Sequence, residues 1–168
     1  MPQIPCRKFT LADIMILVAF TAGGLAMARH VSLPTSRDWW YVYPMEKGSP
    51  VLAAWTVAVL ALRLRTPRPA ARRVFRQPGA AAGLVSVATL AVWAVIQAIE
   101  AYRNPQGYLT LIVFSGIGVG AAVLGAWLVL LVTRTVRPER GWIDRSGIAI
   151  GCGWISLMGI SLWNAFLR

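Results

Sequence analysis

Charged and metal-binding residues are scarce in this chain of 168 residues. Only 14% of the residues are charged, and there are two cysteines and a single histidine. An ordinary soluble domain has about 25% charged residues, and one histidine cannot build a two-histidine metal site or a bis-histidine haem within one chain. The chain also lacks the GxSxG pattern of a nucleophilic serine and the HExxH pattern of zinc proteases. These absences predict a protein that is not an enzyme and has no metal or cofactor.

Apolar residues dominate instead, at 57% of the chain, and they form five long runs. A helix needs about 20 apolar residues to cross roughly 30 Å of hydrocarbon. The expected spans are about 9–28, 50–64, 79–101, 108–133 and 147–167, with an outer loop at 29–49 and a basic inner loop at 65–78. The sequence therefore predicts an all-α fold, a single domain that is a polytopic bundle of five transmembrane helices.

The second run is shorter than the others, and two interpretations of it remain open. It is either a full span, extended by aromatic residues before it and by snorkelling Arg63 and Arg65 after it, or a re-entrant or interfacial segment. The full span is favoured because its removal would reverse the side of every later connector and destroy the charge pattern of the chain.

The basic residues alternate between the two sides of the predicted bundle. Most of the 17 lysines and arginines lie before the first run and in the second and fourth connectors. This set is Arg7, Lys8, Arg63, Arg65, Arg68, Arg72, Arg73, Arg76, Arg134, Arg137, Arg140 and Arg145. Basic residues near span ends resist translocation, which predicts that the N-terminus is inside and the C-terminus outside. Cys6 and Cys152 then share the reducing side, where a disulfide is not expected.

The net charge of +11 would also suit a nucleic-acid-binding protein. The basic residues, however, lie in short connectors between apolar runs. Such a placement predicts contact with anionic lipid headgroups rather than with nucleic acid.

The first run also has features of a secretory signal. A basic start and an apolar run precede Ala26-Met27-Ala28, which has the small-x-small form of a cleavage site. Asp13 within the run and the length of the run favour an uncleaved span. Either outcome leaves residue 30 outside, so the remaining topology is unchanged.

Polar residues recur along one face of the third run. They share that face because their spacing is three or four residues, and a polar face is expected to point into the bundle. The members are Ala82, Ser86, Thr89, Trp93, Gln97 and Glu100. Ser86, Thr89, Gln97 and Glu100 are therefore candidate pathway residues of a transporter or channel.

Two ionisable residues fall within the apolar runs, Asp13 and Glu100. They are expected near opposite ends of the bundle, roughly 20 Å apart on ordinary helix rise, so they cannot act as a paired acid and base. Asp13 is expected to cap its helix or to pair with Arg7 or Lys8. Glu100 is expected to pair with Arg103 or Arg168.

Small residues mark the faces on which helices approach one another in hydrocarbon. They occur at helical spacing in three runs, as Gly116 and Gly120, as Gly147 and Gly151, and as Ala19, Gly23 and Gly24. Packing within the chain is the favoured interpretation, and a dimer face is the alternative.

Aromatic residues form two groups. The outer loop contains Arg37, Trp39, Trp40, Tyr41 and Tyr43, which indicate either an aromatic belt at the membrane boundary or a surface that docks a partner protein. Deeper tryptophans are expected to fill the core and to find an acceptor for each indole N–H. They are Trp55, Trp93, Trp127 and Trp154.

Three motifs carry a resemblance to a known group. The opening Arg7-Lys8-Phe9-Thr10-Leu11-Ala12-Asp13-Ile14 resembles the "RxFTLxDLLLLVA" opening of many small multi-span proteins from planctomycete bacteria. Arg72-Arg73-Val74-Phe75-Arg76-Gln77-Pro78-Gly79 and Trp142-Ile143-Asp144-Arg145 are similar to their inner-loop patterns. The resemblance implies a bacterial inner-membrane protein with multiple spans. Those proteins are largely uncharacterised, so it implies no activity and no site residue.

The motifs also have structural interpretations. Gln77-Pro78-Gly79 is expected to begin a helix compactly, and Asp144 is expected to contact the free N–H groups at the start of the fifth helix. The functional hypothesis is a non-catalytic accessory or scaffolding subunit of a membrane assembly, with other subunits or a second copy as partners. The alternative is a small oligomeric transporter or channel that uses the polar face of the third run.

The charge pattern makes a prediction about topology. Reporter fusions placed after Arg76 and after Arg168 should report opposite sides of the membrane, because an odd number of spans separates them. Agreement between the two reporters would contradict the five-span topology.

Overall fold

The computed structural model describes residues 10–30, 43–65, 76–103, 108–136 and 141–166. Within these ranges the side chains of residues 30, 43, 100–103, 108–114 and 164–165 are outside the description. The described chain forms five helices and no strand. They are α1 (Leu11–His30), α2 (Tyr43–Leu64), α4 (Pro78–Arg103), α5 (Tyr108–Val132) and α6 (Trp142–Phe166). Each contains a stretch that is long and apolar enough to cross a membrane, which confirms the predicted fold class.

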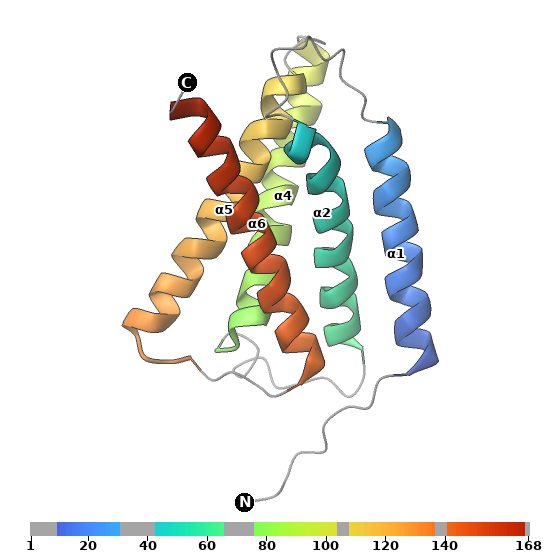
Figure 1. The fold of residues 1–168 in the computed structure, drawn as a ribbon, viewed down its shortest axis with the longest axis vertical. Coiled ribbons are helices and arrows are strands. Elements are labelled where there is room, and N and C mark those ends of the chain that lie inside the picture. The colour runs from blue at the N-terminus through green and yellow to red at the C-terminus, as the bar shows by residue number, and fades with distance from the viewer. Residues whose placement is uncertain (1–9, 31–42, 66–75, 104–107, 137–140, 167–168) are drawn as a thin grey trace, which may run out of the picture.

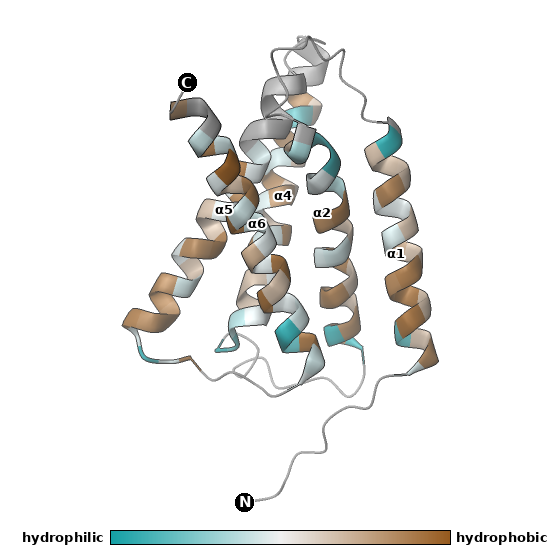
Figure 2. Cartoon of the chain, in the orientation of Figure 1, coloured by the Kyte–Doolittle hydropathy of each residue, from teal (hydrophilic) through white to brown (hydrophobic). Residues whose placement is uncertain are grey.

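The helices run alternately up and down (Figure 1). The same end of the bundle therefore contains the starts of α1, α4 and α6 and the ends of α2 and α5. We call it the arginine-rich end, after the basic residues described there, Arg63, Arg65, Arg76, Arg134 and Arg145. Figure 2 shows that hydrophilic residues gather towards the helix ends, whereas the middle of the bundle is largely apolar. The cytoplasmic location of the arginine-rich end remains a prediction from the arginine pattern.

Two helices begin earlier than expected. α2 starts at Tyr43 rather than near Pro50, and its 22 residues are enough for a full span. Pro50 lies inside this helix, where it lacks the N–H that would bond to the carbonyl of Glu46. α6 starts at Trp142 rather than at Gly147. In both cases an acidic residue that was placed before the span lies in the first turn of the helix, Glu46 in α2 and Asp144 in α6. A carboxylate is favoured there by the helix dipole.

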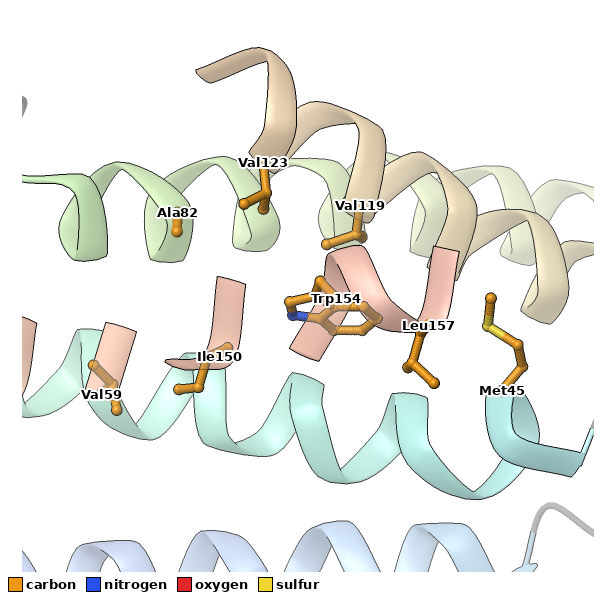
Figure 3. Packing of buried hydrophobic residues seen from close by; sticks show 8 residues of the cluster. All are labelled: Met45, Val59, Ala82, Val119, Val123, Ile150, Trp154 and Leu157. Carbon is orange, nitrogen blue, oxygen red and sulfur yellow. The ribbon is translucent and has the colours of Figure 1, made fainter. Parts of the chain in front are cut away.

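Helices α2, α4, α5 and α6 surround one apolar core (Figure 3). Its centre is Trp154, which is fully buried and whose Nε1 donates a hydrogen bond to Thr56 Oγ1 at 3.2 Å. The cluster consists of Met45, Val59, Ala82, Val119, Val123, Ile150, Trp154 and Leu157. Because lipid tails are as apolar as these side chains, close packing rather than exclusion of water holds this core together.

Helix α1 lies at the edge of the bundle, beside α2 (Figure 1). Only 17% of its apolar window is buried, against 33% in each of the other four helices. Trp55 of α2 was expected in the core, but it is 42% exposed, and its Nε1 donates to Thr21 Oγ1 of α1 at 2.9 Å. The indole therefore ties α1 to α2 from outside the core.

Most of the small-residue positions pack within the chain, as predicted. A Cβ atom on Gly120 would lie 2.8 Å from the carbonyl oxygen of Trp154, and one on Gly24 would lie 3.0 Å from the Cβ of Ala54. Gly23 differs, because nothing lies within 4 Å of the position that its Cβ would occupy. The face of α1 that contains Gly23 is therefore not used for contacts among the described residues.

The central tryptophan provides a test of the core. Trp154→Ala should lower the free energy of unfolding by about 3 kcal/mol, the low end of the range for soluble cores. The cost of leaving a cavity remains, whereas the cost of moving apolar surface out of the core is smaller in lipid than in water. Trp163→Ala is the matched control on the same helix: Trp163 is 68% exposed, and the change should cost no more than about 0.5 kcal/mol. Unfolding in mixed micelles titrated with a denaturing detergent gives both values. Equal losses would contradict a core centred on Trp154.

Candidate functional site

Three polar side chains are buried together at the arginine-rich end. Arg63 is 7% exposed, and Gln77 and Asp144 are each 2% exposed. They come from the end of α2, the residue before α4 and the first turn of α6. We call Arg63, Gln77 and Asp144 the buried polar cluster.

Asp144 connects these elements. Its Oδ1 accepts a hydrogen bond of 3.1 Å from the backbone N of Gly79 and lies 3.7 Å from Nη1 of Arg63. The N–H of Gly79 belongs to the first turn of α4, where backbone donors have no partner inside their own helix. The sequence predicted contact between Asp144 and the start of its own helix; the structure shows that its carboxylate reaches the start of α4.

Two glycines make this contact possible. A Cβ on Gly79 would collide with the backbone carbonyl oxygen of Asp144, and one on Gly147 would lie 2.6 Å from the carbonyl oxygen of Gly79. The starts of α4 and α6 therefore touch backbone to backbone. From α5, Trp127 Nε1 donates to the carbonyl oxygen of Pro78 at 3.0 Å. The motifs at residues 77–79 and 142–145 thus form a single junction, although they are far apart in sequence.

Two buried atoms of the cluster, Nε of Arg63 and Oε1 of Gln77, have no hydrogen-bond partner of their own. Oε1 of Gln77 is buried and accepts no hydrogen bond. A buried acceptor of this kind costs about 1–3 kcal/mol.

Asp13 forms a second polar contact at the same end. Its Oδ2 accepts a hydrogen bond of 3.0 Å from the backbone N of Thr10, and its own N donates to the carbonyl oxygen of Thr10. The bond from Thr10 N to the Asp13 carboxylate is the one that the third helical residue makes in a capping box, and it begins α1. The carboxylate is fully buried and lies 3.7 Å from Nη1 of Arg65, whose side chain is 48% exposed. Arg7 and Lys8, the partners that the sequence predicted, lie outside the described residues.

A buried carboxylate at the opposite end was not predicted. Glu46 is 2% exposed, and its Oε1 lies 2.7 Å from Nζ of Lys47, which also donates to the carbonyl oxygen of Ala28 at 2.8 Å. The sequence treated Glu46 as a loop residue. Pro44 is the signal that would have found it, because proline is favoured in the first turn of a helix.

The candidate pathway residues lie away from the buried polar cluster. Ser86 is fully buried, with no hydrogen-bond partner for its hydroxyl oxygen, whereas Thr89 and Gln97 are half-buried. Ser86 therefore faces into the bundle, as expected. The side chain of Glu100 is outside the description, but its place near the end of α4 puts it at the opposite end of the bundle from Asp13.

The candidate outer surface is mostly outside the description. Arg37, Trp39, Trp40 and Tyr41 lie between the described ranges, and Tyr43 begins α2 with its side chain undescribed. Among the described residues, no three histidine, cysteine, aspartate or glutamate side chains are grouped so that they could hold a metal ion.

Five apolar helices, tied together at their ends by buried polar contacts, place the chain in the class of multi-pass helical membrane proteins. Comparison with protein-family models, with curated proteins and with solved structures finds no match. The class therefore rests on the length, composition and packing of these helices.

The two ion pairs at the arginine-rich end predict unequal effects of the same substitution. Asparagine keeps an acceptor for the backbone N–H, so it removes only the charge. Asp144→Asn should lower the free energy of unfolding by about 3 kcal/mol, because it leaves the buried Arg63 without this carboxylate. Asp13→Asn should cost about 1 kcal/mol or less, because Arg65 is half exposed and stays solvated.

The same unfolding measurement is made on a double variant, which distinguishes the loss of the ion pair from misfolding. Adding Arg63→Met to Asp144→Asn should recover most of the loss, since no buried charge is then stranded. Equal losses for the two single variants, or no recovery in the double variant, would show that the Arg63–Asp144 pair does not hold the junction.

Proposed function

We propose that the chain is a non-catalytic integral membrane protein that acts as an accessory or scaffolding subunit of a larger membrane assembly. The observation that carries the proposal is the division of the bundle into a filled interior and an unused outer helix face. Both halves of this observation are needed, because a scaffold must be rigid inside and must offer a surface outside.

The interior supports the proposal because its polar groups serve contacts between helices. Asp144 bonds to the start of α4, and Thr56 accepts the N–H of Trp154. Ser86 is fully buried. A transporter needs polar groups that face a water-filled path near the middle of the membrane. On the polar face of α4, Ala82 belongs to the packed core and Ser86 is fully buried.

The outer face of α1 supports the second half of the proposal. Ala19, Ala22, Gly23 and Ala26 are exposed, and their spacing of three and four residues places them along one side of the helix. Small residues at this spacing let a second helix approach closely. The opposite side of α1 packs on α2 through Gly24, so this side remains for a helix from another subunit.

A small oligomeric transporter or channel is the second candidate. It is supported by the half-buried Gln97 and by the position of Glu100 near the end of α4. In a transporter of this kind, several copies of the chain would have to build the polar path between them. The bacterial inner membrane is the expected location for either function.

Purification from the native membrane in a mild detergent tests the proposal. The chain should be recovered with a defined set of other membrane proteins in fixed stoichiometry. Recovery of copies of this chain alone, with a water-filled path past Glu100, would contradict the accessory role and favour the transporter.

Two matched variants sharpen this experiment. Gly23→Leu should reduce recovery of the partner about tenfold, because a large side chain blocks close approach. Gly125→Leu on α5 is the control, since Gly125 is also exposed and a Cβ there also meets nothing within 4 Å. If both variants keep the partner, the face of α1 is not the docking surface.

A further inference from the structure

At the arginine-rich end α5 diverges from α4 and α6 (Figure 1). Residues of these three helices line an apolar cleft. Its volume is about 190 Å³, and it is lined by Pro78, Trp127, Leu130, Leu131, Val136 and Ile148. The one polar hydrogen among the lining side chains, on Nε1 of Trp127, already bonds to the carbonyl oxygen of Pro78. The cleft therefore offers only apolar surface, and hydrocarbon is the medium that fills such a surface inside a bilayer.

The size of the cleft limits what it holds. Pockets for whole small molecules are roughly 300–1,000 Å³, which is larger than this cleft. The cleft suits part of a flexible chain whose remainder lies in the bilayer, as an acyl chain does.

Arg134, which lies in sequence between the lining residues Leu131 and Val136, has an unusual backbone conformation. Its φ is 51°, the one positive value recorded for a described residue other than glycine. Its N–H bonds to the carbonyl of Leu131 and that of Thr135 bonds to the carbonyl of Leu130, the pattern of a helix end whose left-handed position normally holds glycine or asparagine. A residue that keeps a disfavoured backbone conformation is a candidate for a functional role.

This turn places Arg134 between lining residues of the cleft. Leu131 precedes it on the last turn of α5, and Val136 follows it after the turn that ends the helix. Arg145 approaches from α6: it is exposed and lies three residues before Ile148, so the two share a face of the helix.

The charges described around the cleft have one sign. At the arginine-rich end, the two described carboxylates, Asp13 and Asp144, are 0% and 2% exposed. The exposed charged side chains described there are all arginines: Arg65, Arg76, Arg134 and Arg145. Guanidinium groups bind phosphate through paired hydrogen bonds, and basic pockets between membrane helices bind anionic headgroups.

We propose that this cleft binds one anionic phospholipid, with an acyl chain in the cleft and the phosphate group held by Arg134 and Arg145. The apolar lining requires a hydrocarbon chain, and the arginines close to its lining residues in sequence require a negative headgroup. A phospholipid supplies both in one molecule. The site does not depend on the accessory function, because it uses only residues of this chain.

Lipid titration in a neutral detergent tests the site. Phosphatidylglycerol and phosphatidylcholine with identical acyl chains are added separately, and native mass spectrometry counts the lipids retained on each chain. Phosphatidylglycerol should be retained as one tightly bound molecule per chain, and phosphatidylcholine should not. Equal retention of the two lipids would overturn the proposal.

Arg134→Gly is the informative variant, because glycine suits the left-handed conformation and the fold should be at least as stable. It should weaken phosphatidylglycerol binding about fivefold, the effect of one basic residue at an anionic headgroup. Arg134→Lys should keep most of the binding. Arg29→Gln, at the opposite end of the bundle, is the charge-matched control and should change nothing. Unchanged binding in Arg134→Gly would overturn the proposal.

The contributions of the acyl chain and of the headgroup to lipid binding are tested separately. Ile148→Trp fills the cleft and should lower lipid retention while both arginines are present. Its thermal unfolding in phosphatidylcholine, compared with that of the wild type, shows whether the variant is folded. Inorganic phosphate should fail to displace phosphatidylglycerol, since it cannot occupy the cleft. Full displacement by inorganic phosphate, or full lipid retention by a folded Ile148→Trp variant, would reject an acyl-chain site.

Discussion

The carboxylate of Asp144 is the constraint on which the arginine-rich end of the bundle depends. It is buried in surroundings where an unpaired charge is very costly. Its contacts with Arg63 and with the N–H of Gly79 come from two different helices. Neither α2 nor α4 can move away from α6 without leaving a polar group unsatisfied. The glycines at 79 and 147 follow from the same constraint, because a larger residue would push the helices apart.

In the rest of the bundle, apolar packing holds the middle together and polar contacts join the ends of the helices. In the middle, Trp154 and its neighbours pack without charged groups, and a single indole hydrogen bond to Thr56 orients the ring. At the ends, ion pairs and capping contacts join helices that apolar packing alone would not align, since lipid competes equally for apolar surface. The outer face of α1 and the cleft beside α5 are the places where this internal packing stops. They are also the surfaces to which we assign a partner helix and a lipid.

Much of the fold was predictable from local patterns. Apolar runs predicted five helices because each must satisfy its backbone internally and cross the hydrocarbon. The spacing along α4 predicted that Ser86 faces inward, which its burial confirms. The starts of α2 and α6 were wrong for one reason. Glu46 was placed in the outer loop and Asp144 just before the fifth span, whereas a charged residue is compatible with a membrane helix when the first turn of the helix and a neighbouring group compensate its charge.

The class of protein, the number of helices and the end at which the arginines collect follow from the amino-acid sequence, because hydropathy and helix length act residue by residue. The tertiary structure alone decided which polar groups meet. Arg63 pairs with Asp144 across distant segments, Trp55 turns outward to Thr21, and Arg134 is placed beside a cleft formed by three helices. Such contacts depend on how helices cross and how closely their backbones approach, and no local pattern encodes that distance.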